Sequence, residues 1–206
     1  MKRRDFLKNM ILLSTGVVLL PQLWTAETAE AAWNADGGAG DTDDRDSRLG
    51  IPIKETYLEF SSLQNRDTTD AIVIHHVGNT NRDVSAAEID GWHKNNGWAG
   101  IGYHFVIRKD GTIERGRPMD TVGAHCYEHN WHTVGVNIVG DFESNEPEPE
   151  QLDSGARLVA ALCRHYGITP DRQHIVGHRD LNSTLCPGQL LYDKLPRFVT
   201  MTRKYY

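Results

Sequence analysis

Two histidines and one cysteine stand where short predicted strands end. His75 is near the end of the apolar run AIVIHH (71–76), His178 ends HIVGH (174–178), and Cys186 follows eight residues later. Two imidazole nitrogens and a thiolate suit a catalytic zinc ion, which takes three protein ligands and keeps a fourth position for water. The proline and glycine directly after the thiol favour a tight turn that could present it. The pattern indicates a three-ligand zinc site, although a single His-x7-Cys spacing is also compatible with a plain turn.

The HRDL tetrapeptide of the same segment also occurs in protein kinases. In their catalytic loop, HRDL is followed by three residues and then Asn, but Leu185 stands at that position here. Kinases also have a later DFG segment, whereas the nearest match, 141–143, lacks the glycine and precedes HRD. These differences exclude a kinase.

The first residues have the pattern of a removable export signal. Basic residues precede an apolar run at 10–20, and Ala29-Glu30-Ala31 fits a small-x-small cleavage site. The pair Arg3-Arg4 resembles a twin-arginine signal, and the apolar run is shorter than the roughly 20 residues that span a bilayer. We therefore expect 1–31 to be a twin-arginine-type signal peptide of a periplasmic or extracellular protein without a stable membrane span after cleavage. An uncleaved anchor is the alternative.

The rest of the chain is predicted to be a linker followed by one domain. Residues 34–48 are rich in Gly and Asp and contain no apolar side chain larger than Ala, so we expect a disordered linker over 32–52. The domain is expected over 53–206, which is long enough to bury a core. A formal net charge of −6 offers no bulk attraction for nucleic acid.

The cysteines favour a metal ligand over a redox pair. Cys126, Cys163 and Cys186 are odd in number, so at least one thiol of an exported protein stays unpaired. Metal ligation explains Cys186, while Cys163 lies on the apolar stripe of a predicted helix, where a core role is simplest. Cys126 either pairs with Cys163 or stays free. A redox function is disfavoured because the chain has no C-x-x-C pair.

Strands and helices alternate along the domain. Ser85 and Glu88 form a capping box that predicts a helix over 82–97, and the Asp110-Gly111 turn predicts a hairpin over 103–116. Further elements are expected as strands at 71–76, 133–142 and 174–178 and as helices at 150–166 and 191–199. The predicted fold class is α/β, with a central mixed β-sheet flanked by helices in a single domain.

Four segments in a fixed order resemble one known family. They are VIHHVGNT, GWAGIGYHFVIRKDGTIERGRP, VGAHCYEHNWHTVGVNIVGDF and IVGHRDLNSTLCPG. Together they are similar to the peptidoglycan recognition protein and type-2 N-acetylmuramoyl-L-alanine amidase family, over about 53–198. The resemblance implies a zinc-dependent hydrolase that cuts the amide between N-acetylmuramoyl and L-alanine in bacterial peptidoglycan. Its expected partners are peptidoglycan or muropeptides, and we expect a monomer.

The resemblance also assigns roles to residues. It implies zinc (Zn²⁺) ligands at His75, His178 and Cys186, and a catalytic Tyr103 that follows Ile-Gly. Two residues before the cysteine stands Thr184, as in the catalytic recognition proteins, where phage amidases carry Lys. Of the Tyr103 and Thr184 hydroxyls, one would stabilise the oxyanion that forms on the amide carbonyl during hydrolysis, and the other would orient the attacking water. A hydrogen-bond donor to the Cys186 sulfur is also expected, because one thiolate offsets part of the metal charge.

Four further residues are candidates for substrate binding. His93 and Trp98 could border the groove, although a helix carrying a Trp is usually core, and His125 and Asn130 could contact glycan or peptide, although a surface turn is the alternative. His76 points to the strand face opposite His75 and is expected to be structural.

The rival function is a peptidoglycan-binding module without catalysis. Non-catalytic members of this family typically lack the cysteine ligand. The presence of Cys186, both histidines and Tyr103 favours the enzyme.

Overall fold

In the computed structural model, the described part of the chain comprises residues 45–46 and 48–206, so the predicted signal peptide and most of the predicted linker lie outside it. The described part begins with a two-stranded antiparallel sheet of β1 (Arg45–Asp46) and β2 (Ile51–Pro52). Leu49, between these strands, is buried in the main core. Leu49 therefore packs with the domain, and the bounds 53–206 stay a prediction.

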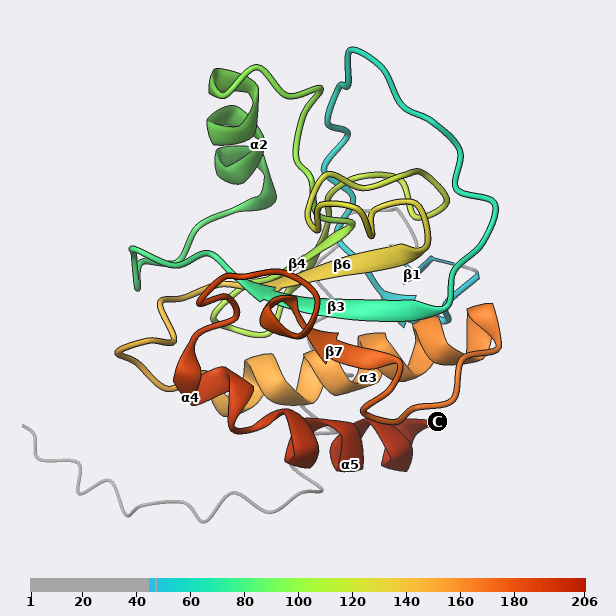
Figure 1. The fold of residues 1–206 in the computed structure, drawn as a ribbon, viewed down its shortest axis with the longest axis vertical. Helices are drawn as coiled ribbons and strands as arrows, with labels where there is room; N and C mark the ends of the chain where they lie inside the picture. The colour runs from blue at the N-terminus through green and yellow to red at the C-terminus, as the bar shows by residue number, and fades with distance from the viewer. Residues whose placement is uncertain (1–44, 47) are drawn as a thin grey trace, which may run out of the picture. The chain divides into compact units, whose positions relative to one another are not determined.

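A five-stranded mixed sheet forms the centre of the domain (Figure 1). Its strands, in the order in which they lie side by side, are β5 (Ile113–Arg115), β4 (Phe105–Ile107), β6 (Thr133–Ile138), β3 (Ala71–His76) and β7 (Ile175–Gly177). β3 runs parallel to both β6 and β7, β4 runs parallel to β6, and β5 pairs antiparallel with β4 in the predicted hairpin. The predicted α/β class is confirmed.

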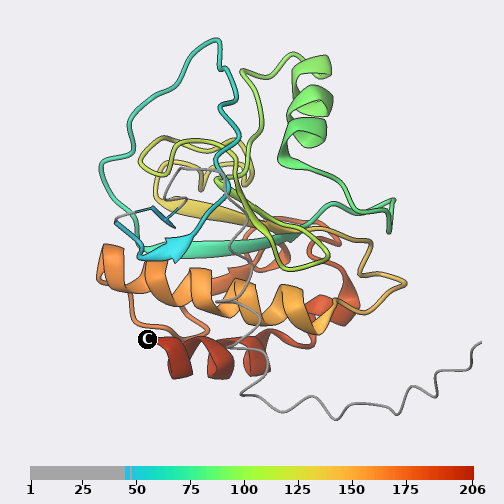
Figure 2. The same ribbon diagram turned by 180° about the vertical axis from the view of Figure 1, so that it is seen from behind.

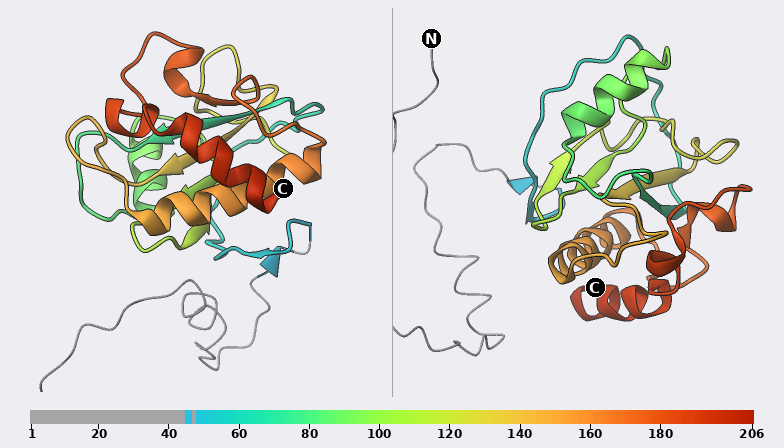
Figure 3. Two further views of the ribbon diagram at one scale, coloured as in Figure 1. Left: turned by 90° about the horizontal axis from the view of Figure 1, so that it is seen from below. Right: turned by 90° about the vertical axis from the view of Figure 1, so that its left-hand side faces the viewer.

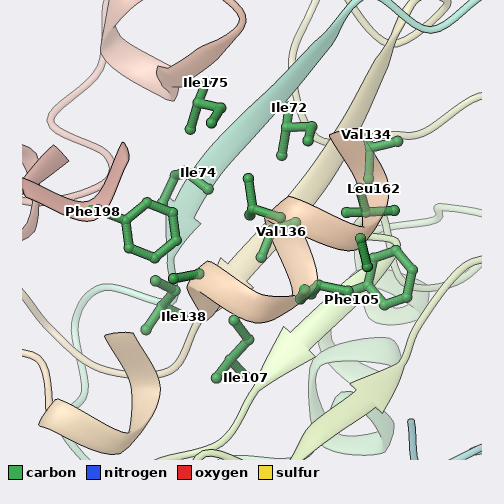
Figure 4. Close-up of a cluster of buried hydrophobic side chains, with 14 of the residues drawn as sticks. Ile72, Ile74, Phe105, Ile107, Val134, Val136, Ile138, Leu162, Ile175 and Phe198 are labelled. Carbon is green, nitrogen blue, oxygen red and sulfur yellow. The ribbon is translucent and has the colours of Figure 1, made fainter. Parts of the chain in front are cut away.

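Helices cover both faces of this sheet, which is why its central strands are almost continuously apolar. α3 (Pro149–Tyr166) and α5 (Leu195–Tyr205) pack together on one face, and α2 (Ala86–Asn95) lies on the other (Figures 2 and 3). Figure 4 shows the larger core, in which Leu162 and Phe198 from the helices meet sheet residues such as Val136.

The C-terminal helix differs from the prediction. Instead of one helix over 191–199, the chain forms the short α4 (Gln189–Tyr192), breaks, and starts α5 at Leu195. Pro196 lies in the first turn of α5, where its missing N–H has no helical partner to lose. The apolar spacing of this segment therefore spans two helices. Among the described residues, no helix has the length and apolar character needed to cross a membrane.

α2 is fixed at its N-terminal end by local and distant contacts. The predicted capping box is present, since Glu88 N–H donates to Ser85 Oγ and the Glu88 carboxylate accepts from Ser85 N–H. Buried Glu114 of β5 accepts a 2.7 Å hydrogen bond from Ala86 N–H and pairs with Arg108 at 3.0 Å. α2 is thereby tied to the hairpin, and this connection sets the position of the segment that leads to Tyr103.

Candidate metal centre

Two adjacent parallel strands bring the predicted histidines together. Ile74 of β3 pairs with Gly177 of β7, so His75, the next residue of β3, and His178, the first residue after β7, lie at the same edge of the sheet. The loop after His178 returns Cys186 to this edge. The possible ligand atoms of the three residues lie within 4.8 Å of one another, and Cys186 Sγ is 3.6 Å from His75 Nδ1. In the described residues, two nitrogen atoms and one sulfur atom are thus close enough together to bind a single metal ion.

Burial sets the protonation of this group. It lowers the pKa of His75 well below the usual value, with further lowering by nearby His125 and His178, and it lowers the pKa of His178 as well. Both imidazoles are therefore neutral, which is the form that binds metals. Burial raises the pKa of the Cys186 thiol to about 12. A positive charge beside the sulfur is needed to hold it as a thiolate at neutral pH.

His76 supports the sulfur through its backbone. Its N–H donates to Cys186 Sγ at 3.4 Å, so the expected donor to the sulfur is present. Its side chain lies elsewhere, where Nδ1 accepts from Phe142 N–H and the ring stacks on Phe142. The structural role predicted for the His76 side chain is confirmed.

The outer nitrogens of both predicted ligands have partners that the sequence did not indicate. His75 Nε2 lies 3.0 Å from Nδ1 of buried His125, and His178 Nε2 lies 3.1 Å from Asn182 Oδ1. His125 was predicted only as a substrate contact. Asn182 was missed, although its spacing of four residues from His178 is one at which side chains meet on a helical turn.

An open pocket of about 550 Å³ adjoins the candidate metal-binding group. Its lining includes the residues Trp98, Tyr103, His125, Asn130, His178 and Thr184. Five predicted site residues therefore surround the same space as His178.

His93 is placed differently from its prediction. It is absent from the pocket lining and lies behind it, with its ring 4.5 Å from the Trp98 ring and 5.5 Å from the Tyr103 ring. Its Nδ1 accepts a 2.9 Å hydrogen bond from Gly102 N–H. His93 supports the pocket wall, because the helix turns its side chain toward the backbone that carries Tyr103.

Two residues of the pocket lining, Tyr103 and Thr184, carry a hydroxyl group. The Tyr103 ring lies 5.0 Å from the His75 ring, and burial raises the pKa of Tyr103 above its usual value, so its hydroxyl is protonated and can donate. Thr184 Oγ1 accepts from Cys186 N–H at 3.2 Å, which orders the loop that carries the sulfur and leaves the hydroxyl hydrogen available. Both groups can act as neutral donors, and a neutral hydroxyl is a poor general base.

Asn130, which also lines the pocket, holds the backbone at 125–126. Its Oδ1 accepts hydrogen bonds from the N–H groups of His125 and Cys126, at 2.8 and 2.9 Å. Cys126, Cys163 and Cys186 are all free thiols, so the alternative of a Cys126–Cys163 disulfide is not realised.

Gly102 provides a test of how tightly this wall is built. A Cβ at Gly102 would lie 2.0 Å from the Ala124 carbonyl oxygen. We therefore expect Gly102→Ala to lower the free energy of unfolding by about 1–3 kcal/mol. The control is Gly91→Ala in α2, where a Cβ meets nothing within 4 Å and a gain of about 0.5–1 kcal/mol is expected. Urea denaturation measures both, and equal stability of the two variants would contradict this close packing.

This α/β domain places two histidines and a cysteine, a possible metal-binding group, beside an open pocket. Residues 65–189 match the family described as N-acetylmuramoyl-L-alanine amidase (Amidase_2), and the chain belongs to this family. The enzyme class expected from the sequence, an N-acetylmuramoyl-L-alanine amidase, is confirmed.

Known relatives agree with this assignment. The chain is 38% identical over 136 residues to the endolysin of Enterobacteria phage K11, covering 64% of this chain and 86% of the phage protein. It is 32% identical over 153 residues to a peptidoglycan recognition protein of Trichoplusia ni, covering 71% and 80%. The solved structure of N-acetylmuramoyl-L-alanine amidase LysC from Clostridium intestinale superposes with a TM-score of 0.66 at 35% identity, covering 73% of this chain and 98% of LysC.

Proposed function

We propose that the chain hydrolyses the amide bond between N-acetylmuramoyl and L-alanine in bacterial peptidoglycan with one zinc ion held by His75, His178 and Cys186. The observation that carries this proposal is the convergence of their ligand atoms within 4.8 Å beside the pocket. Zinc fits the donor set, because two neutral imidazoles and one thiolate are ligands that it prefers. The relatives support peptidoglycan or its fragments as the substrate, and we propose that a monomer acts on it.

The bound zinc ion would supply Lewis-acid polarisation of the amide carbonyl and a lowered pKa for a bound water. The protein supplies position and hydrogen bonds. We assign the Tyr103 hydroxyl as the donor to the oxyanion that develops on the carbonyl oxygen, because it is protonated and lies beside His75. We assign Thr184 to orient water and to hold Cys186 through its backbone.

Substrate binding is proposed for the pocket walls. Trp98 is 45% exposed at the rim and offers an apolar surface to sugar or peptide groups. His125 and Asn130 also line the pocket, while His93 acts indirectly by holding the backbone before Tyr103.

Digestion of purified sacculi tests the activity. The zinc-loaded protein is expected to release new L-alanine amino ends and new lactyl carboxylates in equal amounts, identified by mass spectrometry. Protein stripped with a chelator should release none until zinc is restored. Binding to sacculi without new ends would support the non-catalytic binding module.

We also propose that residues 1–31 direct twin-arginine export to the periplasm or the cell exterior. Proteins exported this way are folded beforehand, so zinc would bind Cys186 while the thiol is still reduced. Replacing Arg3 and Arg4 by Lys is expected to leave the protein in the cytoplasm with residues 1–31 attached. Fractionation and mass determination measure this, with Lys2→Arg as the control. Export of the double variant at the parent rate would refute the twin-arginine assignment.

A further inference from the structure

We infer that Asn182 is a positioning residue that holds the His178 ring with Nδ1 directed to the metal ion. This inference rests on the proposed zinc site and concerns a residue outside the ligand set. Asn182 Oδ1 lies 3.1 Å from His178 Nε2. An imidazole that binds a metal through one nitrogen is oriented by the hydrogen bond that its other nitrogen makes.

The orientation of the Asn182 amide follows from its neighbours. Its Nδ2 lies 3.2 Å from the carbonyl oxygen of Tyr127 and 3.1 Å from that of Leu181. Both oxygens can only accept, so the amide nitrogen must face them, and the amide oxygen must face His178. Because Oδ1 can only accept, the hydrogen of His178 lies on Nε2. The lone pair is then on Nδ1, and this is the nitrogen available to a metal ion.

Cys126 gives Asn182 a second anchor. The Cys126 thiol is buried and donates to the same Oδ1 at 3.2 Å, although 56 residues separate the two in the chain. The adjacent Tyr127 carbonyl receives the Nδ2 hydrogen bond. Asn182 therefore connects the pocket wall at 126–127 to the loop that runs from His178 to Cys186. This gives the buried Cys126 thiol a role that needs neither a disulfide nor a metal.

Loss of Oδ1 would act on metal binding more than on folding. The χ2 torsion of histidine is broad and roughly two-fold, so without its acceptor the ring can turn and carry its hydrogen on either nitrogen. Both changes reduce the fraction of protein with Nδ1 ready to bind. Removal of such outer partners typically weakens metal binding about 10–100-fold.

The experiment compares variants in the full-length protein by zinc affinity. Asn182→Ala removes the acceptor, Asn182→Asp keeps an oxygen at the same position, and Asn65→Ala is a control at an exposed asparagine. We expect Asn182→Ala to bind zinc about 10–100-fold more weakly in chelator competition, and Asn182→Asp and Asn65→Ala to stay within a few-fold of the parent. The absorption spectrum of the cobalt-loaded protein should change in Asn182→Ala and be restored in Asn182→Asp.

Parent-like zinc affinity in a folded Asn182→Ala protein would overturn the inference. If Asn182→Ala does not fold, Asn182→Leu, which keeps most of the side-chain volume and also lacks Oδ1, takes its place, and parent-like zinc affinity in Asn182→Leu would overturn the inference. A parent protein that binds no zinc would overturn the proposed metal site first, and this is measured before the variants are compared.

Discussion

Cys186→Ala is expected to lose the bound zinc ion and the amidase activity together. The change removes the only sulfur of the predicted ligand set, whose atoms converge within 4.8 Å, and two histidines alone leave the site one ligand short. Metal analysis after dialysis should fall from one zinc per chain to near zero. Release of amino ends from sacculi should fall to the level of a sample without enzyme.

The matched control is Cys163→Ala. Cys163 is a buried free thiol of α3 within the main core, so this variant should lose some stability and keep one zinc per chain. Full zinc content in Cys186→Ala would remove this cysteine from the metal site.

Tyr103→Phe is expected to separate binding from chemistry. The variant keeps the ring that lies beside His75 and His93, at 5.0 and 5.5 Å between ring centres, and removes only the hydroxyl. We therefore expect parent-like zinc content, stability and binding to sacculi. The turnover rate should fall about 10²–10³-fold, as when one donor to an oxyanion is removed.

The control for this variant is Tyr57→Phe, because Tyr57 is 85% exposed and is not part of the pocket lining. It should keep the parent turnover rate. Unchanged turnover in Tyr103→Phe would remove the Tyr103 hydroxyl from the mechanism. A loss of zinc in Tyr103→Phe would instead assign the hydroxyl to the metal site.

Local signals explain what could be predicted from the sequence. The apolar run of β3 and the Ser85–Glu88 capping box depend on residues close in sequence, and both formed as expected. The two histidines of the candidate metal site were predicted to lie together because they occupy the ends of buried strands. The structure places β3 and β7 side by side, and this pairing brings His75 and His178 together.

The remaining features depend on contacts between distant segments. The contact between His75 and His125 joins positions 50 residues apart, and the contact between Asn182 and Cys126 joins positions 56 residues apart. Neither contact follows from a helical or strand periodicity, so the sequence pattern does not reveal it. The direction of His93 was missed for a related reason, because helical spacing gives the side on which a residue lies but not the backbone group that it will contact.

The hydrogen bond from His76 N–H to the Cys186 sulfur affects which substitutions at position 76 the site can tolerate. This donor belongs to the main chain, so a codon change at position 76 preserves it unless the new residue is proline, which has no N–H. The side chain at position 76 can therefore change during evolution, limited by its packing against Phe142, while the backbone hydrogen bond to the sulfur is kept. A comparison of side chains across relatives would not reveal this support, because it is encoded in the path of β3.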